Sequence, residues 1–110
     1  MKTGKISNTN NGWFVGDFPN AVFNSKDFEV CWRIHKKNEF WDLHYQKKSI
    51  EINLLIDGDL VLNNEQFTSG DIFILYPYEI TDVKFLTDCS IVCIKTPSLP
   101  NDKVKVLIDD

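Results

Sequence analysis

The sequence has no hydrophobic run long enough to cross a membrane and no excess of basic charge. No stretch reaches the roughly 20 consecutive apolar residues of a transmembrane helix, and the N-terminal segment MKTGKISNTNNG lacks the apolar core of a signal peptide. The 12 lysines and arginines are outnumbered by 16 acidic residues, giving a net charge of -4 and no attraction to nucleic acid or anionic lipid. We therefore predict a cytoplasmic protein that binds neither nucleic acid nor membranes.

Cysteine is scarce, and Cys31, Cys89 and Cys93 do not have the spacing of a disulfide framework. An odd number without such a spacing suits a reducing compartment, so we expect small buried hydrophobic residues rather than redox or metal groups. The sequence also lacks a Ser–His–acid order, a phosphate-binding loop and a Cys–His pair. These absences remove the basis for predicting a hydrolase or a transferase.

Helical periodicity is absent as well. No segment keeps apolar residues at i, i+3, i+4 and i+7 beyond about two turns, whereas short runs rich in Val, Ile, Phe, Tyr and Trp recur between turn residues. With 110 residues, 43% of them hydrophobic, the chain can bury the core of one domain. We predict an all-β fold with a polar, flexible N-terminal arm at 1–12 and a single domain at 13–110.

Turn signals divide the chain into short strands. The dipeptide Asp57-Gly58 can take the positive backbone angles of a two-residue hairpin, which would join strands at 50–56 and 60–62. Asn63-Asn64 turns the chain again, and Pro77 ends a strand because it cannot donate to a ladder. Short strands at close spacing are typical of a sandwich or a closed barrel. The expected strands are 13–16, 27–36, 40–46, 50–57, 60–62, 72–76, 83–86, 90–95 and 104–108.

The segment HYQKKSIEINLLIDG carries polar residues at the spacing His44-x-Gln46-x4-Glu51-x6-Gly58. This pattern resembles the first motif of the cupin family, G-x5-H-x-H-x(3,4)-E-x6-G, and its spacing matches throughout that segment. It departs from the motif at two positions, because Asn38 stands where the first glycine would be and Gln46 replaces the second histidine.

Residues 69–83 resemble the second cupin motif, with Gly70-Asp71 opening a strand and Pro77 closing it. The histidine of that motif would fall at or near Thr81. The segments GWFVGDF, EINLLIDG and IKTPSLPNDK are also similar to small single-domain cupins found among sugar-nucleotide and surface-polysaccharide genes. The resemblance implies an antiparallel double-stranded β-helix, which is a jelly-roll barrel, with a small-molecule ligand inside it and a homodimer as the assembly.

The first motif predicts a site inside this barrel. Alternate residues of a strand share a face, so His44 and Gln46 can both point inward, and Glu51 can meet them from the next strand. A full cupin site holds a transition metal with three imidazoles and one carboxylate. Here Gln46 and Thr81 offer an amide and a hydroxyl, which hold such metals poorly. We expect either no metal or a weakly bound divalent metal at His44, Gln46 and Glu51.

Glu51 lies in an otherwise apolar run, where an unpaired charge would be costly. His44 is its expected partner. The two could act as a catalytic acid–base pair, or they could form a buried hydrogen-bonded pair that Gln46 completes without any ligand.

The expected ligand-binding residues are Gln46, Thr81, Tyr76 and Arg33. Arg33 could reach a phosphate if its strand face points inward, with a solvated face as the alternative. Tyr76 is one of several aromatic residues that could stack on a sugar or a base. His35 is expected at a strand end in water, and no chemistry is assigned to the segment PNDK at 100–103.

Three functions remain open. The first is a cupin that binds a carbohydrate-like or nucleotide-sugar ligand in its barrel and acts as an isomerase or epimerase through His44 and Glu51. The second is a metal-dependent oxygenase in which these two residues and a further donor hold iron. The third is an accessory or regulatory dimer without catalysis. The missing imidazoles favour the first function over the second and do not separate it from the third.

Overall fold

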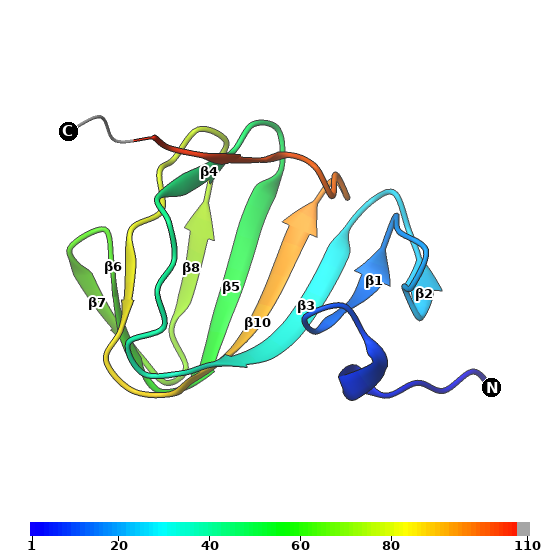
Figure 1. The fold of residues 1–110 in the computed structure, drawn as a ribbon, viewed down its shortest axis with the longest axis horizontal. Helices are drawn as coiled ribbons and strands as arrows, with labels where there is room; N and C mark the ends of the chain where they lie inside the picture. The colour runs from blue at the N-terminus through cyan, green and yellow to red at the C-terminus, as the bar shows by residue number, and fades with distance from the viewer. Residues whose placement is uncertain (108–110) are drawn as a thin grey trace.

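The computed structural model describes residues 1–107, and nearly all of their regular structure is strand (Figure 1). The all-β prediction is therefore confirmed. Positions 108–110 of the expected domain, including the last residue of the strand expected at 104–108, lie outside the described residues. The elements are a 3-10 turn at Ile6–Asn8 and the strands β1 Trp13–Gly16, β2 Phe23–Asn24, β3 Glu29–His35, β4 His44–Gln46, β5 Ile50–Asp57, β6 Asp59–Leu62, β7 Glu65–Thr68, β8 Ile72–Leu75, β9 Val83–Phe85, β10 Cys89–Thr96 and β11 Lys103–Lys105.

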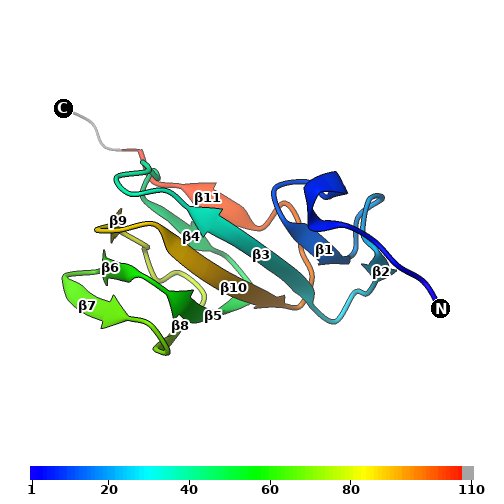
Figure 2. The ribbon, with the colours of Figure 1, turned by 90° about the horizontal axis from the view of Figure 1, so that it is seen from below.

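Three sheets form the barrel (Figures 1 and 2). The large sheet has six strands in the order β2-β1-β3-β10-β5-β8, and the smaller sheets have the orders β11-β4 and β7-β6-β9. In the described chain every strand pairing is antiparallel except that of β1 with β2. Side chains of all three sheets line one cavity, so the smaller sheets face the inner side of the large one. The predicted antiparallel jelly-roll is confirmed.

Strand β5 shows which face of the large sheet points inward. Leu55 is fully buried, and Glu51 and Asn53 line the cavity. The residues between them, Ile52 and Leu54, lie on the outer face, where Leu54 is 38% exposed. Because both sets contain apolar residues, this assignment could not be made from the pattern of the strand alone.

Apolar side chains fill one end of the barrel. They come from the large sheet and from the β7-β6-β9 sheet, and they are Leu55, Leu60, Leu62, Leu75, Phe85, Cys89 and Ile91. Cys31 and Cys89 are buried, Cys93 is half-buried, and all three thiols are free. This environment agrees with their interpretation as small hydrophobic residues.

The hairpin expected at Asp57-Gly58 is wrong. Strand β5 belongs to the large sheet and β6 to a smaller one, so this dipeptide forms a corner between two sheets. Gly58 has a φ of +117°, and a Cβ there would lie 2.5 Å from the carbonyl oxygen of Asp88. The glycine is needed for this close approach of two backbones.

The expected turn at Asn63-Asn64 is confirmed, and it forms the two-residue hairpin of the chain. Both residues have positive φ, 51° and 66°, as the turn types that match strand twist require. Leu62 pairs with Glu65 directly across the turn. Asparagine tolerates this backbone region better than most residues.

The end of the N-terminal segment contacts β3, and the expected flexibility of the arm at 1–12 stays a prediction. Gly12 is buried, and its carbonyl oxygen accepts a hydrogen bond of 3.1 Å from the backbone N–H of Trp32. The thiol of Cys31 contacts the carbonyl of Asn11 at 3.5 Å. The backbone turns at Gly12 with a φ of +90°. This turn brings the end of the arm against β3, where the two contacts form.

The C-terminal segment closes the barrel. Strand β11 pairs with β4, and the Asp102 carboxylate accepts hydrogen bonds of 2.8 Å from the backbone N–H groups of Lys48 and Ser49. Partial burial raises the pKa of Asp102, but these hydrogen bonds outweigh it and hold the pKa below its usual value. No helix among residues 1–107 is long and apolar enough to span a bilayer.

Candidate functional site

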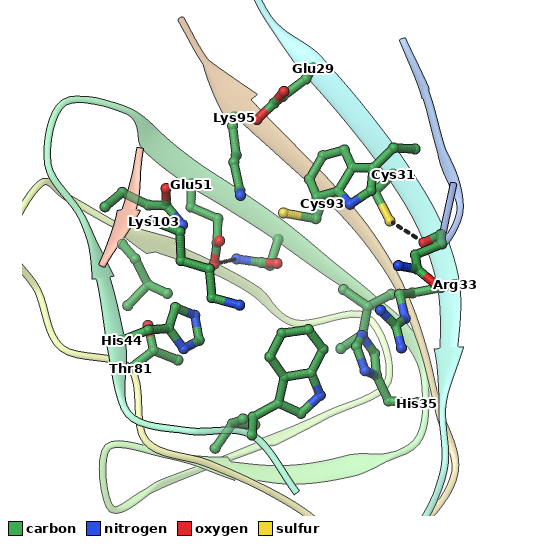
Figure 3. A pocket seen from close by; sticks show the side chains of 18 of the residues that line it. Glu29, Cys31, Arg33, His35, His44, Glu51, Thr81, Cys93, Lys95 and Lys103 are labelled. Carbon is green, nitrogen blue, oxygen red and sulfur yellow. Dashed lines mark hydrogen bonds between the residues drawn. The ribbon is translucent and has the colours of Figure 1, made fainter. Parts of the chain in front are cut away.

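A cavity of about 490 Å³ lies between the large sheet and the two smaller ones (Figure 3). This volume is within the range of about 300–1,000 Å³ that is usual for small-molecule sites. Its inner end is the apolar cluster of the core, and its other walls combine polar side chains with apolar ones such as Trp13, Phe18 and Trp41. The polar and charged lining residues of the strands are Glu29, Arg33, His35, His44, Gln46, Glu51, Asn53, Lys95 and Lys103, and Thr81 joins them from the segment before β9.

His44 is buried on β4, and its ring points into the cavity. Its Nδ1 lies 2.9 Å from the backbone carbonyl oxygen of Asp42. A carbonyl can only accept, so Nδ1 carries the proton and Nε2 of the neutral ring is an acceptor. Burial lowers the pKa of His44, although the hydrogen bond to Asp42 opposes this effect. The imidazole is therefore placed to act as a neutral base.

Glu51 reaches the same cavity from β5, which belongs to a different sheet from β4. Its Oε2 accepts a hydrogen bond of 3.1 Å from the side-chain amide of Asn53. The expected direct pair with His44 is wrong for the described chain, because no hydrogen bond or ion pair joins the two side chains. The reason is that β4 and β5 belong to different sheets, with the cavity between them.

Gln46 is 6% exposed, and neither atom of its side-chain amide has a hydrogen-bond partner within residues 1–107. The expectation that it completes a network with His44 and Glu51 is therefore wrong. A buried polar group without a partner costs about 1–3 kcal/mol. Since Gln46 also lines the cavity, its amide is free to bind a molecule held there.

Thr81 brings the second motif next to the first. It is buried, lines the cavity, and donates its backbone N–H to the carbonyl oxygen of His44 at 2.7 Å. Arg33 also lines the cavity, so its strand face points inward. Tyr76 does not reach the cavity and is 55% exposed. Leu75 points inward at the end of β8, and the alternation along the chain turns Tyr76 outward.

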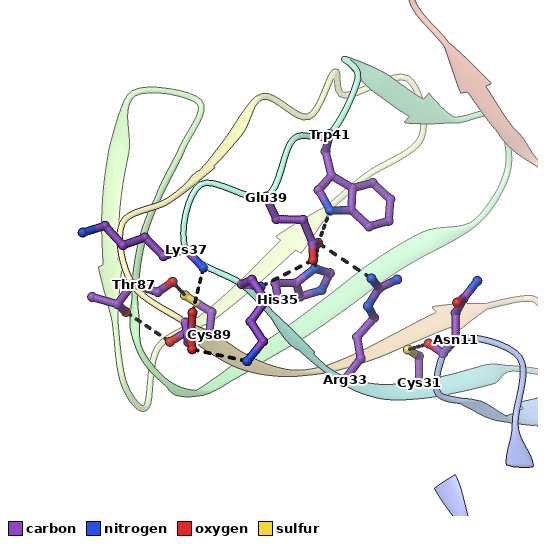
Figure 4. A network of polar contacts seen from close by, with 11 residues as sticks. Asn11, Cys31, Arg33, His35, Lys37, Glu39, Trp41, Thr87 and Cys89 are labelled. Carbon is purple, nitrogen blue, oxygen red and sulfur yellow. Dashed lines mark hydrogen bonds and ion pairs between the residues drawn. The ribbon is translucent and has the colours of Figure 1, made fainter. Parts of the chain in front are cut away.

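His35 is not in water, contrary to expectation. It lines the cavity, and its ring stacks on Phe85 with centroids 4.6 Å apart. Its Nδ1 lies 2.6 Å from the carboxylate of Glu39, which also accepts from the indole N–H of Trp41 at 2.6 Å and approaches Arg33 at 3.7 Å (Figure 4). Burial lowers the pKa of His35 despite the adjacent carboxylate. This network fixes the Trp41 ring at the cavity wall.

Two lysines line the cavity that were not predicted from the sequence to do so. Lys95 on β10 lies 4.9 Å from the centroid of Trp13, and Lys103 on β11 lies 4.4 Å from that of Trp41. Lys95 follows the apolar residue Cys93 by two positions on the same strand, so the alternation of side chains would have placed both on the inner face. No sequence signal identifies Lys103, because its orientation depends on pairing with β4, more than 50 residues earlier in the chain.

The donor set does not fit a tight transition-metal site. In residues 1–107 no three side chains from His, Cys, Asp or Glu come together as a possible metal site. One imidazole, one carboxylate and a weak amide are available, and the ammonium groups of Lys95 and Lys103 share the cavity. The expected weak metal at His44, Gln46 and Glu51 stays a prediction, and no chemical step is assigned to it.

No protein-family model matches the sequence, and no curated protein matches it. Solved structures do. A protein with a double-stranded β-helix domain from Klebsiella pneumoniae superposes with a TM-score of 0.66 at 16% identity, over 74% of this chain and 72% of its own. An RmlC-like cupin from Shewanella frigidimarina gives a TM-score of 0.60 at 14% identity, over 72% and 73%.

The DMSP lyase DddQ from Ruegeria pomeroyi gives a TM-score of 0.70 at 11% identity, over 86% of this chain and 49% of that enzyme. These identities are too low to transfer an activity, but the likeness in fold agrees with the strand order and the internal cavity described above. The chain therefore has the cupin fold and forms one small double-stranded β-helix domain.

Proposed function

We propose that this cupin binds a carbohydrate-like or nucleotide-sugar ligand inside its barrel. The observation that carries the proposal is Gln46, a buried amide without a partner that faces a cavity of about 490 Å³. A sugar hydroxyl can both donate to its oxygen and accept from its nitrogen. The indole of Trp41 at the cavity wall adds an apolar surface on which a sugar ring can pack.

The proposed chemistry is proton transfer of the isomerase or epimerase type, through His44 and Glu51. The two side chains line one cavity from different sheets, and no hydrogen bond joins them within the described chain. His44 Nε2 can remove a proton from a substrate carbon next to a carbonyl, whose oxygen takes the electron pair, and Glu51 in its protonated form can return a proton to that carbon as the electron pair moves back. His44 then releases its proton to solvent and Glu51 takes one up, which restores both groups. A direct hydrogen bond between them would have left neither free for substrate.

A binding experiment tests the ligand proposal. Sugars and nucleotide sugars are titrated into the wild-type protein, the Gln46→Leu variant and a matched Gln66→Leu control, which makes the same change at an exposed position of β7. We expect Gln46→Leu to weaken binding at least about tenfold while the control binds normally. Equal binding by all three proteins contradicts the proposal.

Deuterium incorporation tests the chemistry on the ligand that binds most tightly. In D2O the wild-type protein should exchange a carbon-bound hydrogen of that ligand, and His44→Gln and Glu51→Gln should each slow the exchange at least about 100-fold while binding persists. Binding without any exchange in the wild-type protein contradicts the catalytic part and leaves an accessory protein without catalysis.

We also propose that a second copy of the chain covers the outer face of the large sheet. Val92 lies between Trp32 and Leu54 in the cross-strand register, and Ile94 lies between Val30 and Ile52. No ionisable residue lies on this face of β3, β5, β8 and β10 within the described chain. An uncharged apolar sheet is complementary to itself about a two-fold axis, and this supports a homodimer.

A further inference from the structure

The side chains of Gln46 and Lys103 are hydrogen-bond donors of the cavity that have no partner within residues 1–107. The carboxylate of Glu29 accepts from the Ser98 hydroxyl at 3.2 Å, and that of Glu51 accepts from Asn53 at 3.1 Å. On the donor side, the Gln46 amide has no partner, and Lys103 makes no ion pair or side-chain hydrogen bond within residues 1–107. A ligand group that supplies acceptors would satisfy these two donors.

Lys103 and Lys95, the two lysines of the cavity, differ in the residues that lie opposite them on the neighbouring strands. In the cross-strand register Lys95 lies between Glu29 and Glu51, so carboxylates flank it on both sides. Lys103 has Gln46 as its register partner on β4. The carboxylates of Glu51 and Asp42 act on its charge, but Lys103 forms no ion pair within residues 1–107.

The register also brings Lys103 and Gln46 close together. Residues directly opposite in an antiparallel pair have Cβ atoms about 4.5–5.5 Å apart on the same face of the sheet. Figure 3 shows the Lys103 side chain pointing into the cavity, and its ammonium lies 4.4 Å from the centroid of the Trp41 ring. The contact with the indole holds the flexible lysine over the cavity mouth.

We propose that the Lys103 ammonium and the Gln46 amide N–H together bind an anionic group of the ligand, either a carboxylate or a phosphate. The inference rests on the proposed function, which supplies the ligand, and adds the charge that the ligand carries. Both groups donate, and hydrogen bonds from an ammonium to an anionic oxygen are among the stronger ones in proteins. Burial and the nearby Lys95 lower the pKa of Lys103, whereas the carboxylates of Glu51 and Asp42 raise it, and the net direction is downward. A bound anion would oppose this lowering.

Isothermal titration with four probes tests this inference. Glucose, glucuronate and glucose 6-phosphate share the same sugar skeleton and differ in charge. Inorganic phosphate supplies the anion without a sugar. The proteins are the wild type, Lys103→Gln and a matched Lys84→Gln control, whose lysine is exposed on β9 and forms no ion pair in the described chain. Comparison of glucuronate with the two phosphates separates a carboxylate site from a phosphate site.

We expect at least one anionic probe to bind the wild type about tenfold or more tightly than glucose, and this preference to weaken with salt. Lys103→Gln should abolish the preference and leave glucose binding unchanged, and Lys84→Gln should alter neither. Equal affinity of the wild type for glucose and the anions overturns the inference, as does an equal loss in both lysine variants.

The Gln46→Leu variant separates failure of this inference from failure of the proposed function. If Gln46→Leu weakens binding of every probe while Lys103→Gln keeps the anion preference, the ligand proposal stands and the role of Lys103 is overturned. If the wild-type protein binds none of the four probes and none of the nucleotide sugars, both are overturned.

Discussion

On the inner face of the large sheet, Glu29, Lys95 and Glu51 form a row across β3, β10 and β5, whereas on the outer face Trp32, Val92 and Leu54 form a row across the same strands. Soluble antiparallel sheets usually show the reverse, with apolar residues inward and polar residues outward. A polar inner row suits the polar ligand proposed above, and an apolar outer row suits the proposed contact with a second copy. The two proposals therefore use opposite faces of one sheet.

The inner face itself changes character along each strand. On β5, Glu51 and Asn53 line the polar part of the cavity, and Leu55 belongs to the apolar cluster at its end. On β10, Lys95 and Ile91 make the same division. The cluster stabilises the barrel, so the polar part of each strand does not need to contribute to the core and is available for a site.

The largest expected effect separates two adjacent leucines of β5. Leu55 is fully buried in the cluster, so Leu55→Ala should lower the free energy of unfolding by about 2–5 kcal/mol. Leu54 is 38% exposed on the outer face, and Leu54→Ala should cost less than about 1 kcal/mol in the monomer. Urea denaturation at low protein concentration measures both values. Equal losses would contradict the assignment of the two faces.

A charge on the outer face should affect association rather than folding. Leu54→Arg places an unpaired charge at the centre of the proposed contact between two copies, which should raise the dimer dissociation constant about 100-fold or more. Sedimentation equilibrium measures this constant. Gln66→Arg, at an exposed position of β7, is the control and should leave it unchanged. A wild-type protein that is monomeric at all concentrations contradicts the contact.

The smallest expected effect is the pH dependence of the inner face. Burial lowers the pKa of both His44 and His35 from the ordinary value of 6.5. The unfolded chain therefore binds protons before the native protein does, and the free energy of unfolding should fall as pH drops below about 6.5. The slope should stay below about 1.4 kcal/mol per pH unit for each histidine. His44→Gln should flatten it, and unfolding measured at pH 7.5 and 5.5 would contradict the expectation if stability rose on acidification.

Much of the fold could be predicted from local patterns, because the strand periodicity and the turn at Asn63-Asn64 depend on residues close in sequence. The corner at Asp57-Gly58 could not. Its dipeptide is a good hairpin former, but the backbone of Asp88 approaches from a distant part of the chain and determines where β6 goes. Strand β2 was missed because two residues cannot show an alternation.

The candidate site also has features that could be predicted from the sequence and features that could not. The resemblance to the cupin motif predicted that His44, Gln46 and Glu51 share a cavity, and all three line it. The alternation of the strands alone did not show which face points inward. The absence of a His44–Glu51 bond depends on which sheet each strand joins. The position of Lys103 depends on the long-range register of β11 with β4. Neither property is encoded in a local pattern.

The unpartnered amide of Gln46 links the lifetime of the protein to its ligand. This buried group makes no hydrogen bond to another residue within residues 1–107, and it lines the cavity of the proposed ligand. A ligand that bonds to it stabilises the native state in proportion to the logarithm of its concentration. Since proteolytic turnover follows the population of the unfolded form, the amount of this protein in a cell would rise and fall with the supply of the molecule that it binds.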